Sequence, residues 1–153
     1  MIRGRAIHNV GMVNRLHQVA LDHGAPARVE AYLGPNLGYA DLLIEAGNLK
    51  VIAEAERSPR RVQRDLAKAI AIHATHLFIA TPTRRLAERI GVHLRRYPLP
   101  PDLVIEVRPL AQAAQRLRDL LSRSPRAQCA PDSNAGNSKR GPIAAPAKMR
   151  EQP

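Results

Sequence analysis

The chain has 153 residues and a net charge of +11, from 24 Lys and Arg against 13 Asp and Glu, which suits one domain and favours a polyanionic partner such as nucleic acid. The single Cys129 excludes an internal disulfide and a cysteine-based zinc site. No apolar run approaches the ~18 residues of a membrane-spanning helix, and the N-terminus lacks the apolar centre of a signal peptide, so we expect a cytoplasmic protein with no membrane role.

A helix and a strand open the predicted domain. Val13, Leu16 and Val19 recur at helical spacing, and the sequence HGAP that follows stops the helix. Residues 27–33 alternate weakly between apolar and polar side chains, which predicts a strand that ends in the turn sequence GPNLG. Two stronger strands follow, over residues 40–46 and 49–56, joined by the two-residue loop typical of a tight hairpin.

Helices and strands alternate along the rest of the domain. Ser58 and Pro59 suit the N-cap and first turn of a helix over residues 59–74. Its core face is expected to carry Val62, Leu66, Ala69 and Ile70. The elements predicted next are a strand over 75–82, a helix over 83–94, a strand over 102–109 and a helix over 110–122. This alternation indicates an α/β fold in which helices flank one mixed sheet.

The last part of the chain has a different composition. Residues 1–122 form the predicted domain, whereas residues 123–153 combine Pro, Gly and Ser with almost no large apolar side chain. Such a segment cannot bury enough surface to order itself, so we expect a disordered basic tail. The tail either adds nonspecific affinity for phosphates or serves as a solubilising extension.

Acidic residues gather at one end of the predicted hairpin. Its two-residue loop sets a register in which Asp41 faces Glu54, and like charges facing each other across strands destabilise a sheet. Because side chains alternate along a strand, Glu56 points to the same face. A divalent cation such as Mg²⁺ would relieve the repulsion. In the alternative reading the acids are solvated and neutralised by Arg57, Arg60 or Arg61.

This arrangement resembles the PD-(D/E)XK nuclease superfamily, which has an Asp at the start of one hairpin strand and Glu-x-Lys in the next. Asp41 and the sequence Glu54-Ala55-Glu56 occupy those places. The order helix, three strands, helix, strand is also similar over residues 9–81, and implies a restriction endonuclease-like core. By this resemblance, Asp41, Glu54 and the Ala55 carbonyl hold Mg²⁺ or Mn²⁺.

The sequence departs from the family pattern at the lysine position, which holds Glu56. Some members of the family have Glu there, and some shift a functional residue to the following helix, where Gln63 and Lys68 lie. Lys68 lies outside the apolar stripe of that helix, which favours a solvated lysine over a catalytic one. The family's further acid on the first helix has no clear equivalent, and neither Asp22 nor Glu30 is assigned to it.

The function that these features predict is endonucleolytic cleavage of DNA. In phosphodiester hydrolysis, Glu56 would bind a second cation or accept a proton from the attacking water. Four arginines next to the acids, Arg57, Arg60, Arg61 and Arg64, are expected to contact phosphates. An aromatic content of 3% offers little base stacking, which favours duplex or branched DNA over single strands.

The residues leave two further readings open. A nuclease-like module that has lost catalysis together with its lysine would bind DNA or a partner protein without responding to Mg²⁺. An unrelated α/β scaffold with incidental acids would lose neither activity nor metal binding on Asp41→Ala. A homodimer would enlarge the footprint of so small a domain and place one site on each DNA strand.

Overall fold

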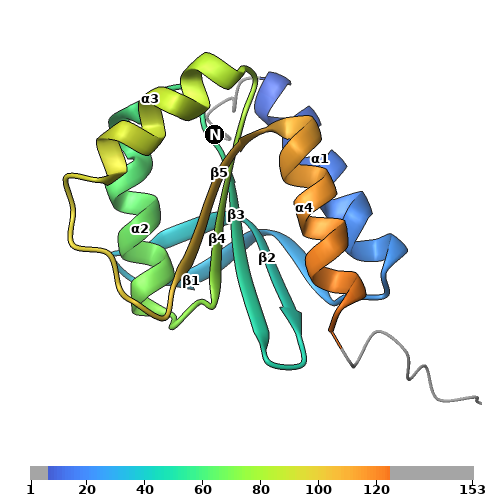
Figure 1. Ribbon diagram of the computed structural model, residues 1–153. Coiled ribbons are helices and arrows are strands. Elements are labelled where there is room, and N and C mark those ends of the chain that lie inside the picture. Colours follow the sequence, from blue (N-terminus) through green and yellow to red (C-terminus); the bar gives the residue numbers. More distant parts are fainter. Residues whose placement is uncertain (1–6, 125–153) are drawn as a thin grey trace, which may run out of the picture.

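The computed structural model describes residues 7–124, which form a five-stranded mixed sheet with helices on both faces (Figure 1). The strands lie in chain order across the sheet: β1 (Ala27–Gly34), β2 (Gly38–Ala46), β3 (Leu49–Ala55), β4 (His76–Thr81) and β5 (Val104–Pro109). The helices are α1 (Ile7–Asp22), α2 (Val62–Ala71), α3 (Arg84–Leu94) and α4 (Leu110–Ser122). β1, β2 and β3 pair antiparallel, whereas β4 and β5 extend the sheet in parallel. The predicted α/β class and the mixed sheet are confirmed.

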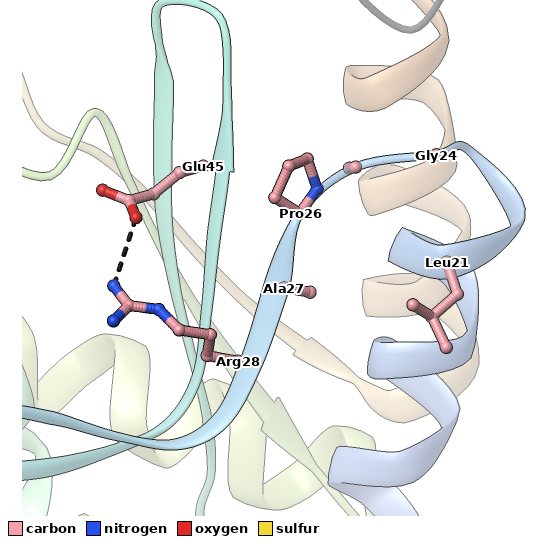
Figure 2. A pocket seen from close by; sticks show the side chains of 7 residues that line it. Leu21, Gly24, Pro26, Ala27, Arg28 and Glu45 are labelled. Atoms are coloured by element: carbon pink, nitrogen blue, oxygen red, sulfur yellow. Dashed lines mark hydrogen bonds and ion pairs between the residues drawn. The ribbon is translucent and has the colours of Figure 1, made fainter. Parts of the chain in front are cut away.

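The first helix ends where the sequence indicates. Gly24 has a φ of +62°, a conformation that glycine adopts without strain. The Ala25 N–H then donates to the Ala20 carbonyl at 2.9 Å, which closes a Schellman-type cap. Figure 2 shows the chain turning here from α1 into β1, beside an apolar pocket whose rim carries the ion pair of Arg28 with Glu45 at 3.2 Å.

The hairpin of β2 and β3 has the predicted register. Leu43 pairs with Ile52 and Glu45 pairs with Lys50 across a loop in which Gly47 has a φ of +60°. Regular pairing extends as far as Leu42 with Ala53 and stops one position before Asp41 and Glu54. The hairpin therefore carries its acids at the point where the backbone ladder ends.

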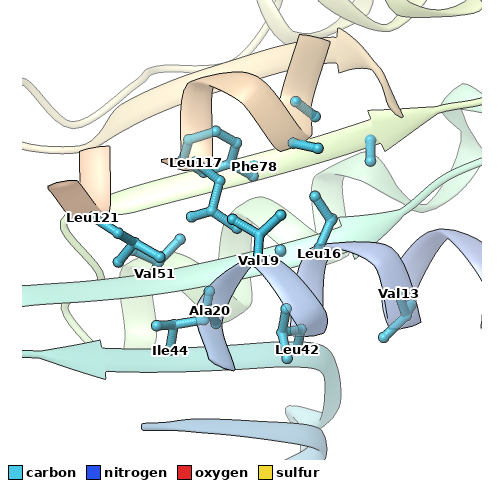
Figure 3. Packing of buried hydrophobic residues seen from close by; sticks show 14 of the residues in the cluster. Val13, Leu16, Val19, Ala20, Leu42, Ile44, Val51, Phe78, Leu117 and Leu121 are labelled. Carbon is cyan, nitrogen blue, oxygen red and sulfur yellow. The ribbon is translucent and has the colours of Figure 1, made fainter. Parts of the chain in front are cut away.

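Two hydrophobic cores sandwich the sheet. One lies against α1 and α4 and contains Leu16, Phe78 and Leu117, as Figure 3 shows. The other, which contains Ile52, Leu66 and further apolar residues, lies against α2 and α3. Burying one such side chain contributes roughly 1.5–3 kcal/mol. Each face of β3 is therefore covered, and α2 is held directly over the acidic end of the hairpin.

The second helix differs from the prediction in several respects, and it ends at Ala71 rather than at residue 74. Residues Pro59–Arg61 form a 3₁₀ turn, and the α-helix starts only at Val62. Ser58 precedes this turn in extended conformation, but its side chain makes no capping hydrogen bond. Ile70, predicted to face the core, is 43% exposed, whereas Asp65 and Lys68 are buried. The buried face is rotated toward these charged residues because Glu54 lies beneath them.

The described part of the chain ends close to the predicted domain boundary. Ser124 is buried, and its hydroxyl donates to the Ala46 carbonyl at 3.4 Å, so the folded part extends two residues beyond residue 122. The rest of the predicted tail lies outside the described residues. Among residues 7–124, none of the helices is long and apolar enough to cross a bilayer.

Candidate active site

An open cleft of about 720 Å³ lies where β2 begins, β3 ends and α2 passes over the sheet. Four carboxylates line it, from Asp41, Glu54, Glu56 and Asp65. We call it the acidic cleft. The apolar pocket beside α1 and β1 contains a single carboxylate, that of Glu45, and this group is already paired with Arg28. The acidic cleft is therefore the better candidate for chemistry.

Asp41 and Glu54 meet as the hairpin register predicts. The Ala55 N–H donates to Asp41 Oδ2 at 3.0 Å, and the Asp41 N–H donates to Glu54 Oε2 at 3.3 Å. Each carboxylate thus accepts a hydrogen bond from the backbone of the opposite strand, in place of the next rung of the ladder. These two donors offset part of the expected repulsion and fix both side chains at the cleft.

Lys68 comes to the same place from α2. Its Nζ lies 2.8 Å from Glu54 Oε1 and 3.0 Å from Asp65 Oδ1, and its side chain is only 8% exposed. The reading of Lys68 as a solvated lysine is therefore wrong. The apolar stripe did not include Lys68 because the buried face of α2 also carries charged residues, among them the lysine that neutralises Glu54.

Burial and crowding of carboxylates dominate the electrostatics. Burial raises the pKa of Glu54 well above its usual value, and the charges of Asp65 and Asp41 raise it further, against the opposing effect of Lys68. Burial alone would lower the pKa of Lys68, but the nearby Glu54 and Asp65 carboxylates more than offset it, and the net shift is upward. The ammonium thus stays protonated beside these carboxylates.

Glu56 and Asp65 form a second carboxyl pair in the cleft. Burial, followed by the charge of Asp65 and a hydrogen bond with it, raises the pKa of Glu56 to about 7. Burial also raises the pKa of Asp65, although Lys68 opposes this. A hydrogen bond between two carboxyl groups requires a proton on one of them. When Glu56 and Asp65 are both ionised, Asp65 Oδ2 has no hydrogen-bond partner. The pair can therefore hold or release a proton near neutral pH.

Sequence reasoning missed two residues of the cleft. Asp65 lies three positions before Lys68 on α2, and this i,i+3 pairing was the signal that could have revealed it. Asn9 of α1 donates from Nδ2 to the Ala55 carbonyl at 3.1 Å, a contact between residues far apart in sequence that no local pattern indicates. Of the two acids left unassigned, Asp22 accepts a hydrogen bond from Gln18 at the other end of α1, and Glu30 lies on β1; neither lines the cleft.

Three arginines also line the acidic cleft, and we call them the arginine rim. They are Arg57, Arg61 and Arg64, as predicted for phosphate-contacting residues. Arg60 lies on the same turn and is exposed, but it is not among the residues that line the cleft. Three of the four predicted basic residues are thus brought beside the acids.

The residues predicted to hold a metal supply hard oxygen donors. These are the carboxylates of Asp41 and Glu54 and the carbonyl of Ala55, a set that suits Mg²⁺ or Mn²⁺. Among residues 7–124, no group of three or more His, Cys, Asp or Glu side chains is arranged to hold a metal ion. Three of the cleft carboxylates, those of Glu54, Glu56 and Asp65, are nevertheless buried beside the ammonium of Lys68, and Asp65 Oδ2 has no hydrogen-bond partner when Glu56 and Asp65 are both ionised. A divalent cation with ligands from two carboxylates, a carbonyl and water fits these oxygen donors.

Comparison with known proteins gives no family assignment: no family model matches the chain, and no curated protein sequence matches it significantly.

Proposed function

We propose that the protein is a metal-dependent DNA endonuclease of the PD-(D/E)XK type, which hydrolyses phosphodiester bonds in duplex or branched DNA. The observation that carries this proposal is the convergence of Asp41, Glu54, the Ala55 peptide and the Lys68 ammonium in one open cleft. Three antiparallel strands followed by a parallel one, with α1 and α2 on opposite faces, are consistent with a restriction endonuclease-like core. In this reading α2 supplies the lysine that β3 lacks.

The groups of the cleft would share out three tasks in this mechanism, namely metal binding, charge neutralisation and proton transfer. Asp41, Glu54 and the Ala55 carbonyl would hold Mg²⁺, which when bound neutralises charge on the phosphate and lowers the pKa of a water. Lys68 neutralises Glu54 and holds its carboxylate in place. Glu56, with a pKa of about 7, accepts a proton from the attacking water when it is ionised.

The arginine rim gives the substrate its orientation. Arg57, Arg61 and Arg64 line the cleft together with the carboxylates, so a phosphate backbone that contacts them lies next to the acids. Each cleft would cut one strand of the DNA. We propose that a homodimer would place a second cleft on the other strand, as double-strand cleavage requires.

A second candidate, a nuclease-like module that binds DNA without cutting it, has one observation in its favour. Glu54, a proposed metal ligand, is already engaged by Lys68 at 2.8 Å and by the Asp41 N–H at 3.3 Å. If these contacts persist in the presence of Mg²⁺, the carboxylate cannot serve the metal. This candidate predicts DNA affinity that does not change with Mg²⁺.

Magnesium calorimetry and a cleavage assay test the proposal together. We would titrate Mg²⁺ into the wild type and Asp41→Ala, and assay nicking of supercoiled plasmid and of a four-way junction in the same buffer. Glu45→Ala is the matched control, because Glu45 is an exposed acid on the same hairpin outside the acidic cleft. We expect Asp41→Ala to lose Mg²⁺ binding and nicking while Glu45→Ala keeps both. A wild type that binds DNA but neither binds Mg²⁺ nor cuts would support the inactive module.

A further inference from the structure

Two exposed tyrosines pack against each other, and one of them lines the acidic cleft. Tyr39 lines the cleft and precedes Asp41 by two residues on β2. Tyr32 is its register partner on β1. The two side chains are 57% and 55% exposed for Tyr32 and Tyr39, and their ring centroids lie 5.2 Å apart with planes tilted by 53°. The rings thus form one exposed aromatic surface beside the carboxylates.

This surface concentrates a scarce residue type. The chain has three Tyr, one Phe and no Trp, and Phe78 is fully buried in the core. A cross-strand aromatic pair stabilises a hairpin, which accounts for the pairing of Tyr32 with Tyr39. Hairpin stability alone does not account for the exposure of both rings, since a covered ring would contribute more by burial. An exposed aromatic pair beside the cleft suits a ligand with a flat apolar face.

The surroundings add the chemistry of a phosphate. Gly38, directly before Tyr39, has a φ of +75°, and a Cβ built on it would lie 3.1 Å from Nη2 of Arg64. The guanidinium therefore rests against the backbone beside the aromatic pair, and Arg61 lines the same cleft. A nucleotide with an unpaired base can stack that base on an aromatic face and place its phosphate on a guanidinium group. Both groups are present here.

We propose that Tyr32 and Tyr39 form a stacking platform for an unpaired base next to the phosphate at the acidic cleft. The preferred substrate is then DNA with unpaired bases, such as a gap, flap or open junction, because a fully paired duplex hides the faces of its bases. This inference rests on the proposed function and narrows its substrate. It also revises the expectation from composition, which took the low aromatic content as an argument against stacking.

Binding of two probes without metal tests the platform separately from catalysis. We would measure fluorescence anisotropy of a fluorescein-labelled duplex, fully paired or with a short gap, in EDTA. The variants are Tyr32→Leu/Tyr39→Leu, which keeps apolar bulk in the strands, and Tyr32→Phe/Tyr39→Phe, which keeps the rings. We expect the wild type and the Phe variant to prefer the gapped probe. The Leu variant should lose about tenfold in affinity for the gapped probe and less than twofold for the duplex.

Each other result has a defined meaning. Equal wild-type affinity for both probes, or an equal loss for both in the Leu variant, would overturn the platform and leave the endonuclease proposal standing. A gap preference without cleavage in Mg²⁺ would support the platform and sink the endonuclease. Absence of binding to either probe would overturn the platform, whereas the nicking assay in Mg²⁺ still decides the endonuclease. Because the chain has no Trp, quenching of tyrosine emission by an unlabelled gapped duplex, measured in Tyr97→Phe, gives a second readout from the platform itself.

Discussion

Nζ of Lys68 lies 2.8 Å from Oε1 of Glu54, and both side chains are almost completely buried. The two residues belong to α2 and β3, and only the packing of that helix on the sheet brings them together. Because removing one partner of a buried pair leaves an uncompensated charge, this contact couples the stability of the domain to the integrity of the cleft.

Lys68→Met should destabilise the domain by about 3–5 kcal/mol at neutral pH, because it leaves the Glu54 carboxylate buried without its cation. The loss should be smaller at pH 5, because the raised pKa of Glu54 favours its neutral form as the pH falls. Urea unfolding at the two pH values measures this. The double variant Glu54→Gln/Lys68→Met is the control and should recover part of the loss. A single-variant loss that does not change with pH would contradict the ion pair.

Glu56→Gln should flatten the pH dependence of stability. The pKa of Glu56 rises from 4.5 to about 7 on folding, so the folded state holds the proton more tightly and wild-type stability falls as pH rises through this window. The variant should therefore be more stable than the wild type by roughly 2 kcal/mol above pH 7, less than the full shift implies because solvent partly screens the group. Below pH 4.5 the difference should vanish.

Thermal or urea unfolding across that pH range checks the prediction for Glu56. Glu45→Gln is the matched control, because Glu45 is an exposed acid of the same hairpin. It should leave the shape of the wild-type curve unchanged. A Glu56→Gln curve parallel to that of the wild type would mean that folding does not raise the pKa of Glu56, so that Glu56 is no reservoir for a proton near neutral pH.

Glu56→Lys tests whether the lysine of the family pattern has moved to α2, as Lys68, or has been lost. The variant restores the family pattern on β3, but Lys68 already places an ammonium 2.8 Å from Glu54. We expect no gain in nicking of supercoiled plasmid, and a loss if Glu56 accepts a proton in the reaction. A Glu56→Lys variant that cuts DNA when the wild type does not would instead identify a degenerate site and a misassigned Lys68.

The arginine rim should control the salt dependence of DNA binding. Each phosphate contact contributes about 0.9 to the slope of log K against log salt, so Arg57→Gln/Arg61→Gln/Arg64→Gln should reduce that slope by about 3. Arg60→Gln is the control from the same turn, since Arg60 does not line the cleft. Titrations of a labelled duplex at several salt concentrations measure both. A triple variant that reduces the slope no more than Arg60→Gln does would remove the arginine rim from the proposed path of the DNA.

Local patterns were sufficient for the hairpin and the order of elements. A two-residue loop leaves one register, so the length of the loop was enough to predict that Asp41 meets Glu54. Helical and alternating periodicities predicted each helix and strand to within a few residues at the ends, because apolar residues must face the sheet. The exception was Ile70. It was predicted to face the core because it is apolar and lies at helical spacing, but it is exposed.

Only the tertiary structure decided which polar residues complete the cleft. Asn9, Asp65 and Lys68 come from two helices on opposite faces of the sheet, and their approach to β3 depends on how each helix is rotated about its axis. The rotation of α2 buries its apolar side chains and also brings the Lys68 ammonium to the buried carboxylate of Glu54. Periodicity measures only apolar burial, whereas the free energy of a buried charge depends on partners that are distant in sequence, so the sequence alone could place the acids but not their counterion.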